Sequence, residues 1–145
     1  MTNKNIDIAK SKLNGDISAV LINGNEVIAL KGHGISPVLK LIESNKNYSD
    51  YSLADIVVGK AVATLFVKLG IRNVYARLIS VPAYEYLNEH DVNVQYTTIV
   101  PNILNRNKND ICPMEKAVEN ISDYEQAYTI LKDRYEQMLK KLNCN

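Results

Sequence analysis

The stretch 53-LADIVVGKAVATLFVKLG-70 is the most apolar part of the chain, and its structure decides the fold. Apolar residues fill almost every position, so a helix built from it has almost no polar face in its first three turns. The sequence therefore predicts a central helix at about 53–69, buried nearly all round and ending at Gly70. The run is not a membrane span, because three charged residues interrupt it: Asp55, Lys60 and Lys68.

Upstream of this stretch the sequence predicts a helix, an antiparallel hairpin and a second helix. Residues 5–13 favour a short helix. The strands 17–22 and 26–31 flank Asn23-Gly24, a dipeptide typical of a tight hairpin turn. Residues 36–44 begin with Ser-Pro, the usual N-cap followed by a proline at the first helical position.

Downstream, strands and helices alternate. The strand 73–79, the helix 82–90 and the strand 92–97 follow one another, and this order implies a parallel pair joined by a crossover helix. A short helix at 113–120 comes next. The segment 123–142 repeats apolar residues at three- and four-residue steps, which predicts an amphipathic helix with one buried stripe.

These elements predict one α/β domain over residues 1–145, with its core at about 5–121 and a C-terminal amphipathic helix at 123–142. The antiparallel hairpin and the parallel strands would form a mixed sheet. Helices would cover both faces of this sheet, so the expected architecture is a three-layer α/β/α sandwich.

The composition argues against several classes of function. Seventeen basic and 16 acidic residues give a net charge of +1, which favours neither nucleic acid nor a membrane surface as a partner. The N-terminus has no apolar signal core, and two cysteines give no disulfide framework, so we expect a cytoplasmic protein. With no C-x-x-C or H-x-E motif, and with His33 and His90 in different corners, no metal and no other cofactor is predicted.

Three residues near the start of the predicted central helix are candidates for a site. Asp55 and Gly59 are four residues apart and would share a helix face. A helical glycine costs about 1 kcal/mol relative to alanine and usually marks a close approach by a ligand or a backbone. Lys60 needs solvent, a carboxylate or a bound anion, because an unpaired buried ammonium is very costly.

Structural roles for the same three residues compete with this interpretation. Ser52 and Asp55 match an S-x-x-D capping box, which would explain the aspartate by itself. Gly59 would serve helix packing, and the ammonium of Lys60 would extend to the surface.

Cys112 precedes Pro113 at the start of a predicted helix and so takes its N-cap position. Glu115 can reach back to the Cys112 backbone N–H, as in a capping box. Cysteine is not a preferred cap, and the positive end of the helix dipole favours the thiolate. The positive charges of Arg106 and Lys108 would also favour the thiolate, whereas the negative charge of Glu115 would disfavour it. The alternative is a half-buried structural cysteine.

Several strings resemble a bacterial family catalogued as domain of unknown function 1893. They are 54-ADIVVGKAVA-63, 73-NVYARLIS-80 and 100-VPNILNRNKNDICPMEKAV-118. The resemblance covers nearly the whole chain, to about residue 131, and it implies a cytidine-deaminase-like fold.

The zinc motifs of deaminases are missing, however. Deaminases place H-A-E at the start of the central helix and P-C-x-x-C at the start of the next one. Here the first location reads Leu53-Ala54-Asp55 and the second Ser80-Val81-Pro82, with neither histidine nor cysteine. Zinc-dependent deamination is therefore not expected.

The implied fold places a pocket beyond the strand ends, at the N-termini of the covering helices. Asp55, Gly59, Lys60 and Ser80 would line one wall, and the 105–115 loop would close over it. That loop carries four further candidates: Asn105, Arg106, Cys112 and Glu115. Helix N-termini and cationic side chains suit an anionic or nucleotide-like small molecule.

Two functions follow as hypotheses. In the first, the protein is a ligand-binding protein or a zinc-free enzyme, with Cys112 as nucleophile, Lys60 and Arg106 as anion anchors, and Asp55 and Glu115 handling protons. In the second, the pocket is vestigial and the chain is a non-catalytic homo-oligomeric or partner-binding module, with the Tyr-rich 123–142 helix as its contact face.

Overall fold

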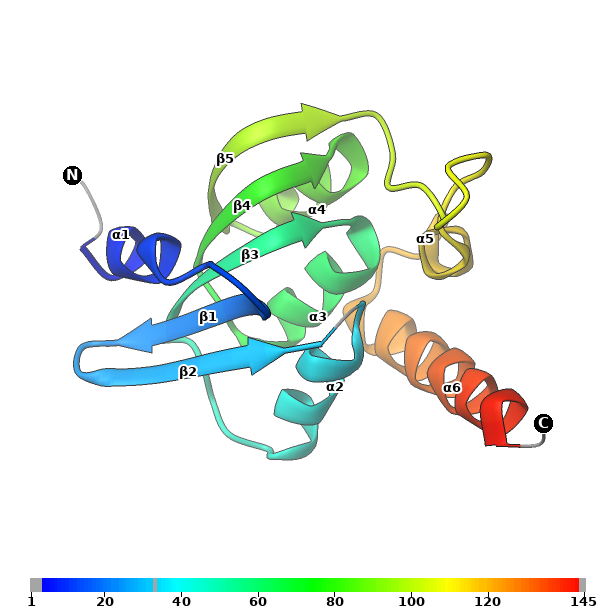
Figure 1. The fold of residues 1–145 in the computed structure, drawn as a ribbon, viewed down its shortest axis with the longest axis horizontal. Coiled ribbons are helices and arrows are strands. Elements are labelled where there is room, and N and C mark those ends of the chain that lie inside the picture. The colour runs from blue at the N-terminus through cyan, green and yellow to red at the C-terminus, as the bar shows by residue number, and fades with distance from the viewer. Residues whose placement is uncertain (1–3, 33, 144–145) are drawn as a thin grey trace.

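The computed structural model describes residues 4–32 and 34–143, which form a five-stranded sheet with helices on both faces (Figure 1). His33 and Cys144 lie outside the described residues. The elements in chain order are α1 (Lys4–Ser11), β1 (Ile17–Asn23), β2 (Glu26–Lys31), α2 (Ser36–Glu43), β3 (Ser52–Val58), α3 (Lys60–Leu69), β4 (Asn73–Ser80), α4 (Val81–Glu89), β5 (Asn93–Val100), α5 (Pro113–Val118) and α6 (Tyr124–Asn143).

The sheet is mixed, as predicted. Its strand order is β2-β1-β3-β4-β5; β1 pairs antiparallel with both β2 and β3, and β3, β4 and β5 run parallel. The predicted hairpin is therefore confirmed, but its turn lies one residue later than expected. Asn23 pairs with Glu26, so Gly24 and Asn25 form the loop, and Gly24 has the positive φ of 58° that such a turn requires.

The predicted helix at 53–69 is wrong in its first half. Residues 52–58 are β3, the central strand of the sheet, and α3 begins only at Lys60. A strand that is covered on both faces is apolar at nearly every position, so its sequence looks like that of a buried helix. Gly59 separates the two elements with an extended backbone (φ −100°, ψ 175°) and is the N-cap of α3. Gly70 ends the helix with a left-handed φ of 84°, as predicted.

This correction changes two further expectations. Ser52 and Asp55 are both strand residues, so the capping box expected between them does not exist. The string compared with the deaminase H-A-E motif, Leu53-Ala54-Asp55, lies within β3 as well. The true start of α3 reads Gly59-Lys60-Ala61, which also has no histidine, cysteine or glutamate.

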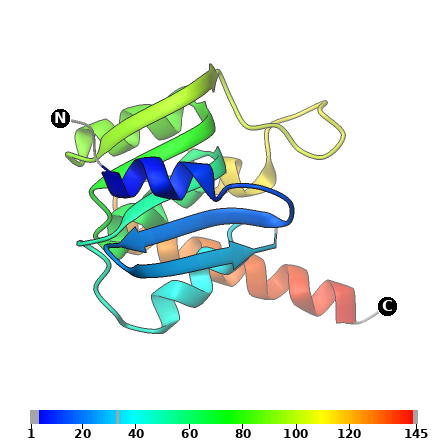
Figure 2. The same cartoon turned by 60° about the vertical axis from the view of Figure 1, so that its left-hand side comes forward.

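The two faces of the sheet are covered unequally. On one face, α1 alone packs across β1, β3 and β4 (Figure 2). Its contacts form a small apolar cluster of Ile6, Ala9, Leu13, Val20, Ile22, Ala54 and Tyr75. On the other face lie α2, α3 and α4, with α5 and α6 packed outside α3, and the main core is centred on α3. Three layers are therefore present, as expected for an α/β/α sandwich.

The last helix packs on its own chain mainly through its first half, with Tyr135 as a partly buried contact beyond it. Ala127 and Leu131 are fully buried, and Lys68 of α3 binds the Glu125 carboxylate with N–O distances of 2.7 and 2.8 Å. Further along, Met138 and Leu139 are 45% and 39% exposed, and Figure 1 shows this end of α6 extending away from the body. The single buried stripe predicted for 123–142 thus ends halfway along the helix. Among the described residues, no helix is both long and apolar enough to cross a membrane.

Candidate functional site

The carboxyl ends of the parallel strands meet where α3 and α4 begin. Val58 pairs with Ile79, and Ser80 pairs with Val100, so the ends of β3, β4 and β5 lie side by side. Gly59 follows β3 directly, and α4 follows β4 directly. Ligands of open α/β sheets bind beyond the carboxyl ends of the parallel strands. The segment from Pro101 to Cys112 and α5 lie beyond these ends (Figure 1).

Glu115 of α5 reaches across to the first turn of α3. Its Oε1 accepts a hydrogen bond from the Lys60 backbone N–H at 2.6 Å, and its Oε2 accepts one from the Ala61 N–H at 2.8 Å. The first turn of α3 has no acidic side chain of its own, and Gly59 cannot supply a side-chain cap. Glu115 therefore satisfies two amides that the helix leaves unpaired, and its negative charge lies at the positive end of the helix dipole.

The close approach of Glu115 explains Gly59. A Cβ at position 59 would lie 2.1 Å from Oε1 of Glu115 and 2.9 Å from Cγ1 of Ile103. A glycine was expected to mark a close approach, and the approaching group is a carboxylate of the same chain.

Glu115 is partly withdrawn from water, and burial raises its pKa above the ordinary 4.5. The two backbone hydrogen bonds and the Lys60 ammonium act in the opposite direction. The contact predicted from Glu115 to the Cys112 backbone is wrong. The Cys112 N–H instead donates to the Ile103 carbonyl at 2.9 Å, because residues 103–112 fold back as a narrow loop.

The Lys60 side chain points toward the far end of α5. Its Nζ donates to the Glu119 carbonyl at 3.0 Å, where α5 ends, and lies 5.9 Å from the centre of the Tyr86 ring. Tyr86 in turn donates its hydroxyl hydrogen to the Ser122 carbonyl at 2.8 Å. Lys60 therefore connects α3 to α5 through two hydrogen bonds. Its backbone N–H donates to the Glu115 side chain near the start of α5, and its ammonium donates to the Glu119 carbonyl at the end of α5.

Asp55 does not belong to this cluster. It lies in β3 between Ala19 of β1 and Ala76 of β4, and burial raises its pKa to about 7. Its Oδ1 accepts a long hydrogen bond of 3.4 Å from the Val57 N–H. Gly59 is four residues further along the chain, a distance of about 13 Å in extended backbone. The shared helix face predicted for Asp55 and Gly59 is therefore wrong, because residue 55 is in a strand.

The remaining predicted residues are divided between the cluster and its surroundings. Ser80 is buried and caps α4, where its Oγ accepts from the Ala83 N–H at 3.2 Å. Asn105 binds Asn109 within the tip of its own loop, through both side-chain atoms. Arg106 is exposed on that tip. Cys112 is half-buried at the N-cap of α5, without a side-chain capping bond.

Sequence reasoning thus found Gly59, Lys60 and Glu115 but not how they meet. It missed the partners Ala61, Ile103 and Glu119. The contact between Glu115 and Lys60 spans 55 residues, and no local pattern in the sequence signals it.

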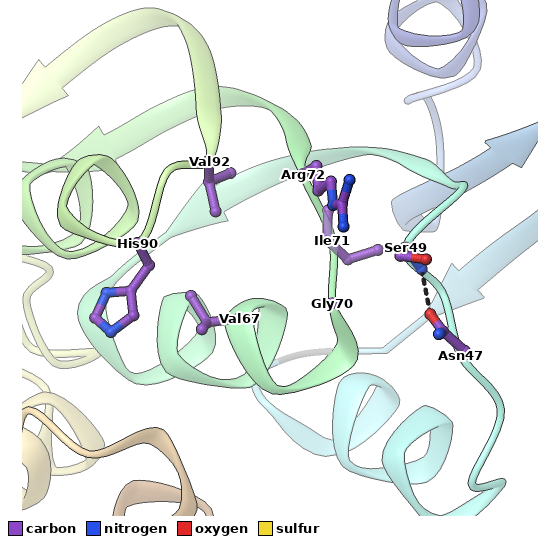
Figure 3. A pocket seen from close by; sticks show the side chains of 8 residues that line it. All are labelled: Asn47, Ser49, Val67, Gly70, Ile71, Arg72, His90 and Val92. Atoms are coloured by element: carbon purple, nitrogen blue, oxygen red, sulfur yellow. Dashed lines mark hydrogen bonds between the residues drawn. The ribbon is translucent and has the colours of Figure 1, made fainter.

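A pocket lies at the opposite end of α3 (Figure 3). It measures about 360 Å³ and is lined by Asn47, Ser49, Val67, Gly70, Ile71, Arg72, His90 and Val92. Figure 3 shows these residues spread apart from one another over several elements. The pocket faces the amino ends of β4 and β5 and the C-terminus of α3, whose carbonyls disfavour anions. We therefore place the candidate site at the Glu115 end of α3 instead.

Among residues 4–32 and 34–143, no three His, Cys, Asp or Glu side chains come together in a way that could hold a metal ion.

The family model for a domain of unknown function, DUF1893, matches residues 8–135. A crystal structure of a DUF1893 family protein from Thermotoga maritima is 27% identical, and the match covers 92% of each chain with a TM-score of 0.81. A search of curated proteins found no match.

Proposed function

Since the chain belongs to the DUF1893 family, whose description names no reaction, we propose a function from the contacts at the start of α3. The protein binds a small anionic or nucleotide-like molecule there, and Glu115 occupies the place of the anion when the ligand is absent.

The observation that supports this proposal is the position of the Glu115 carboxylate at the first two amides of α3. Its two oxygens accept hydrogen bonds from the Lys60 and Ala61 amides at 2.6 and 2.8 Å. Gly59 has no side chain, so the carboxylate can approach the backbone closely. A phosphate or carboxylate of a ligand would be held by the same amides and the same helix dipole. The chain itself therefore supplies an example of the chemistry that the site accepts.

The electrostatics of Glu115 support its displacement. Burial disfavours its charged form, which is why its pKa is raised. When an incoming anion moves the side chain into water, the carboxylate regains its hydration, and this gain offsets part of the two lost hydrogen bonds.

The neighbouring residues would then assist the ligand. The ammonium of Lys60 lies at the Glu119 carbonyl, one turn of α5 beyond Glu115. Arg106 is exposed on the loop that precedes α5 and would supply a second positive charge to the ligand. Cys112 precedes Glu115 by one helical turn, so an enzymatic version of the proposal uses its thiol as the nucleophile toward the bound molecule. Asp55 is left out of this version, because it lies about 13 Å before Gly59 in extended backbone.

Anion binding to two variants of α5 tests the proposal. Inorganic phosphate and AMP serve as probes in calorimetric titrations of the wild type, Glu115→Ala and Glu119→Ala. Both variants remove one negative charge, but only the first vacates the α3 amides, since Glu119 uses its backbone carbonyl. We expect Glu115→Ala to bind at least one probe about tenfold more tightly than the wild type, or about 1.4 kcal/mol, and Glu119→Ala to change little.

Two results would contradict it. Equal tightening in both variants would mean that general charge, and not the vacated amides, controls binding. If Glu115→Ala stays folded and binds neither probe, Glu115 is a structural cap.

A further inference from the structure

One edge of the sheet lacks the protection that edge strands normally carry. β5 is the last strand of the order β2-β1-β3-β4-β5, so one side of its backbone has no strand partner among the described residues. Its sequence, 93-NVQYTTIV-100, contains no charge, no proline and no glycine. Every residue of the strand is exposed except Val94 and Val100, which are partly buried. Natural edge strands are usually shielded by charged side chains, prolines, bulges or a covering element.

The opposite edge of the same sheet shows such shielding. β2 begins with Glu26 and ends with Lys31. Glu26 pairs with Lys46 at 3.1 Å, and Lys31 lies 3.7 Å from Asp16. The two edges therefore differ in charge, although both are long strands of one sheet.

β5 is also held in place on both of its faces. The Tyr96 ring packs edge-on against Tyr84 of α4, with 5.8 Å between the ring centres. On the opposite face, the Thr97 hydroxyl is hydrogen-bonded to the hydroxyl of Tyr75. The strand is therefore regular and held in position, so the backbone groups along its free edge can form hydrogen bonds with another strand.

We propose that β5 pairs antiparallel with β5 of a second copy of this chain, which joins the two sheets across a two-fold axis. A two-fold axis requires the two identical strands to run in opposite directions and places each residue opposite one from the same strand. A charge near the axis would then face its own copy, whereas β5 carries no charge. Its Val, Tyr, Thr and Ile side chains form favourable cross-strand pairs instead.

The surroundings of β5 add to the contact. Tyr96 and Ile99 are 43% and 39% exposed, and Val81 at the start of the adjacent α4 is 39% exposed. In the dimer these apolar side chains would be covered together with the strand edge. The inference is independent of the anion site, because it uses none of the residues that bind Glu115.

A matched pair of variants tests the dimer. The double variant Thr98→Lys/Ile99→Lys places one lysine on each face of β5, and the two-fold axis doubles both charges. The control, Val27→Lys, makes the same kind of change at a 45% exposed position of β2. Light scattering on a sizing column, from about 1 to about 100 µM, should give a dimer for the wild type and for Val27→Lys. The β5 variant should dissociate about 100-fold more readily and run as a monomer.

Hydrogen–deuterium exchange of the wild type provides a test that requires no variant. Amides of β5 should exchange more slowly as the protein concentration rises, while those of β2 should not change. A wild type that remains monomeric at about 100 µM would overturn the proposal. So would a folded β5 variant that stays dimeric, or exchange in β5 that does not depend on concentration.

Discussion

The carboxylate of Glu115 fills the space that a side chain at position 59 would need. A Cβ on Gly59 would lie 2.1 Å from Oε1 and 2.6 Å from Cδ of Glu115. The absence of a side chain on one residue thus allows the other to bind the first two amides of α3. The hydrogen bond from Lys60 to Glu115 joins α3 to α5 through residues that are 55 apart in the chain.

The first prediction concerns this pair. Gly59→Ala should lower the free energy of unfolding by about 1–3 kcal/mol, because the new methyl group displaces Glu115 from the α3 amides. In a Glu115→Ala background the same change should cost clearly less, since the carboxylate is gone. Urea denaturation of the wild type, the two single variants and the double variant measures this coupling. An equal cost in both backgrounds would show that the two residues are not coupled.

The second prediction concerns the pH dependence that Asp55 gives to stability. Its pKa is raised from 3.8 to about 7 in the folded protein, mainly by burial. As the pH rises from about 4 to about 7, the unfolded chain loses this proton while the folded chain keeps it, so the wild type loses stability across that window. Asp55→Asn keeps an oxygen for the Val57 N–H and does not titrate.

The free energy of unfolding of Asp55→Asn should therefore rise relative to the wild type by an amount on the order of a few kcal/mol between pH 4 and pH 7, and level off above. Urea denaturation at several pH values gives the difference between the two proteins. Because Glu115 titrates in both proteins, its own raised pKa cancels in this comparison. A difference that is constant with pH would rule out a protonated Asp55 in the fold.

The third prediction separates the two halves of α6. Leu131→Ala should lower the free energy of unfolding by about 2–4 kcal/mol, because Leu131 is fully buried against the core. Leu139→Ala removes the same atoms from the same helix, but at a residue 39% exposed, and should cost less than about 1 kcal/mol. Thermal and urea unfolding of both variants provide the comparison. Similar losses for the two leucines would mean that the end of α6 is packed in solution.

The fourth prediction concerns the helix cap at Cys112. The thiol makes no capping bond, whereas a serine hydroxyl at this N-cap can accept one from an amide of the first turn. Cys112→Ser should therefore leave the stability unchanged or raise it by up to about 1 kcal/mol. A loss of more than 1 kcal/mol would indicate that the half-buried sulfur is needed for packing. Anion binding should survive the change, since Glu115 and not Cys112 occupies the α3 amides.

Local signals in the sequence located most of the elements correctly. The hairpin, the strands of the parallel pair and the helices near 36, 82, 113 and 123 all rest on turn residues, prolines or apolar periodicity, which act within a few residues. The error at 52–58 has a different origin. A central strand covered on both faces and a buried helix are both continuous apolar runs, so only the break at Gly59 distinguished them.

The candidate site was predicted in part, for a related reason. Gly59 and Lys60 are unusual residues in an apolar run and were identified for that reason. Their contacts to Glu115 and Glu119 depend on how α5 packs against α3, which no short motif specifies. Asp55 was assigned to the site only because it was expected on the same helix as Gly59. A cytoplasmic location and a deaminase-like relationship stay predictions.

The central position of β3 sets the order in which the strands of the sheet can pair while the chain is synthesised on the ribosome. The β1–β2 hairpin closes over a two-residue loop and leaves the ribosome directly after α1, but β1 needs β3 as its second neighbour. Each later strand joins its predecessor through a single helix, so the rest of the sheet grows outward one unit at a time. Until residues 52–58 have left the ribosome, β1 has only β2 to pair with, and one edge of the hairpin stays unpaired.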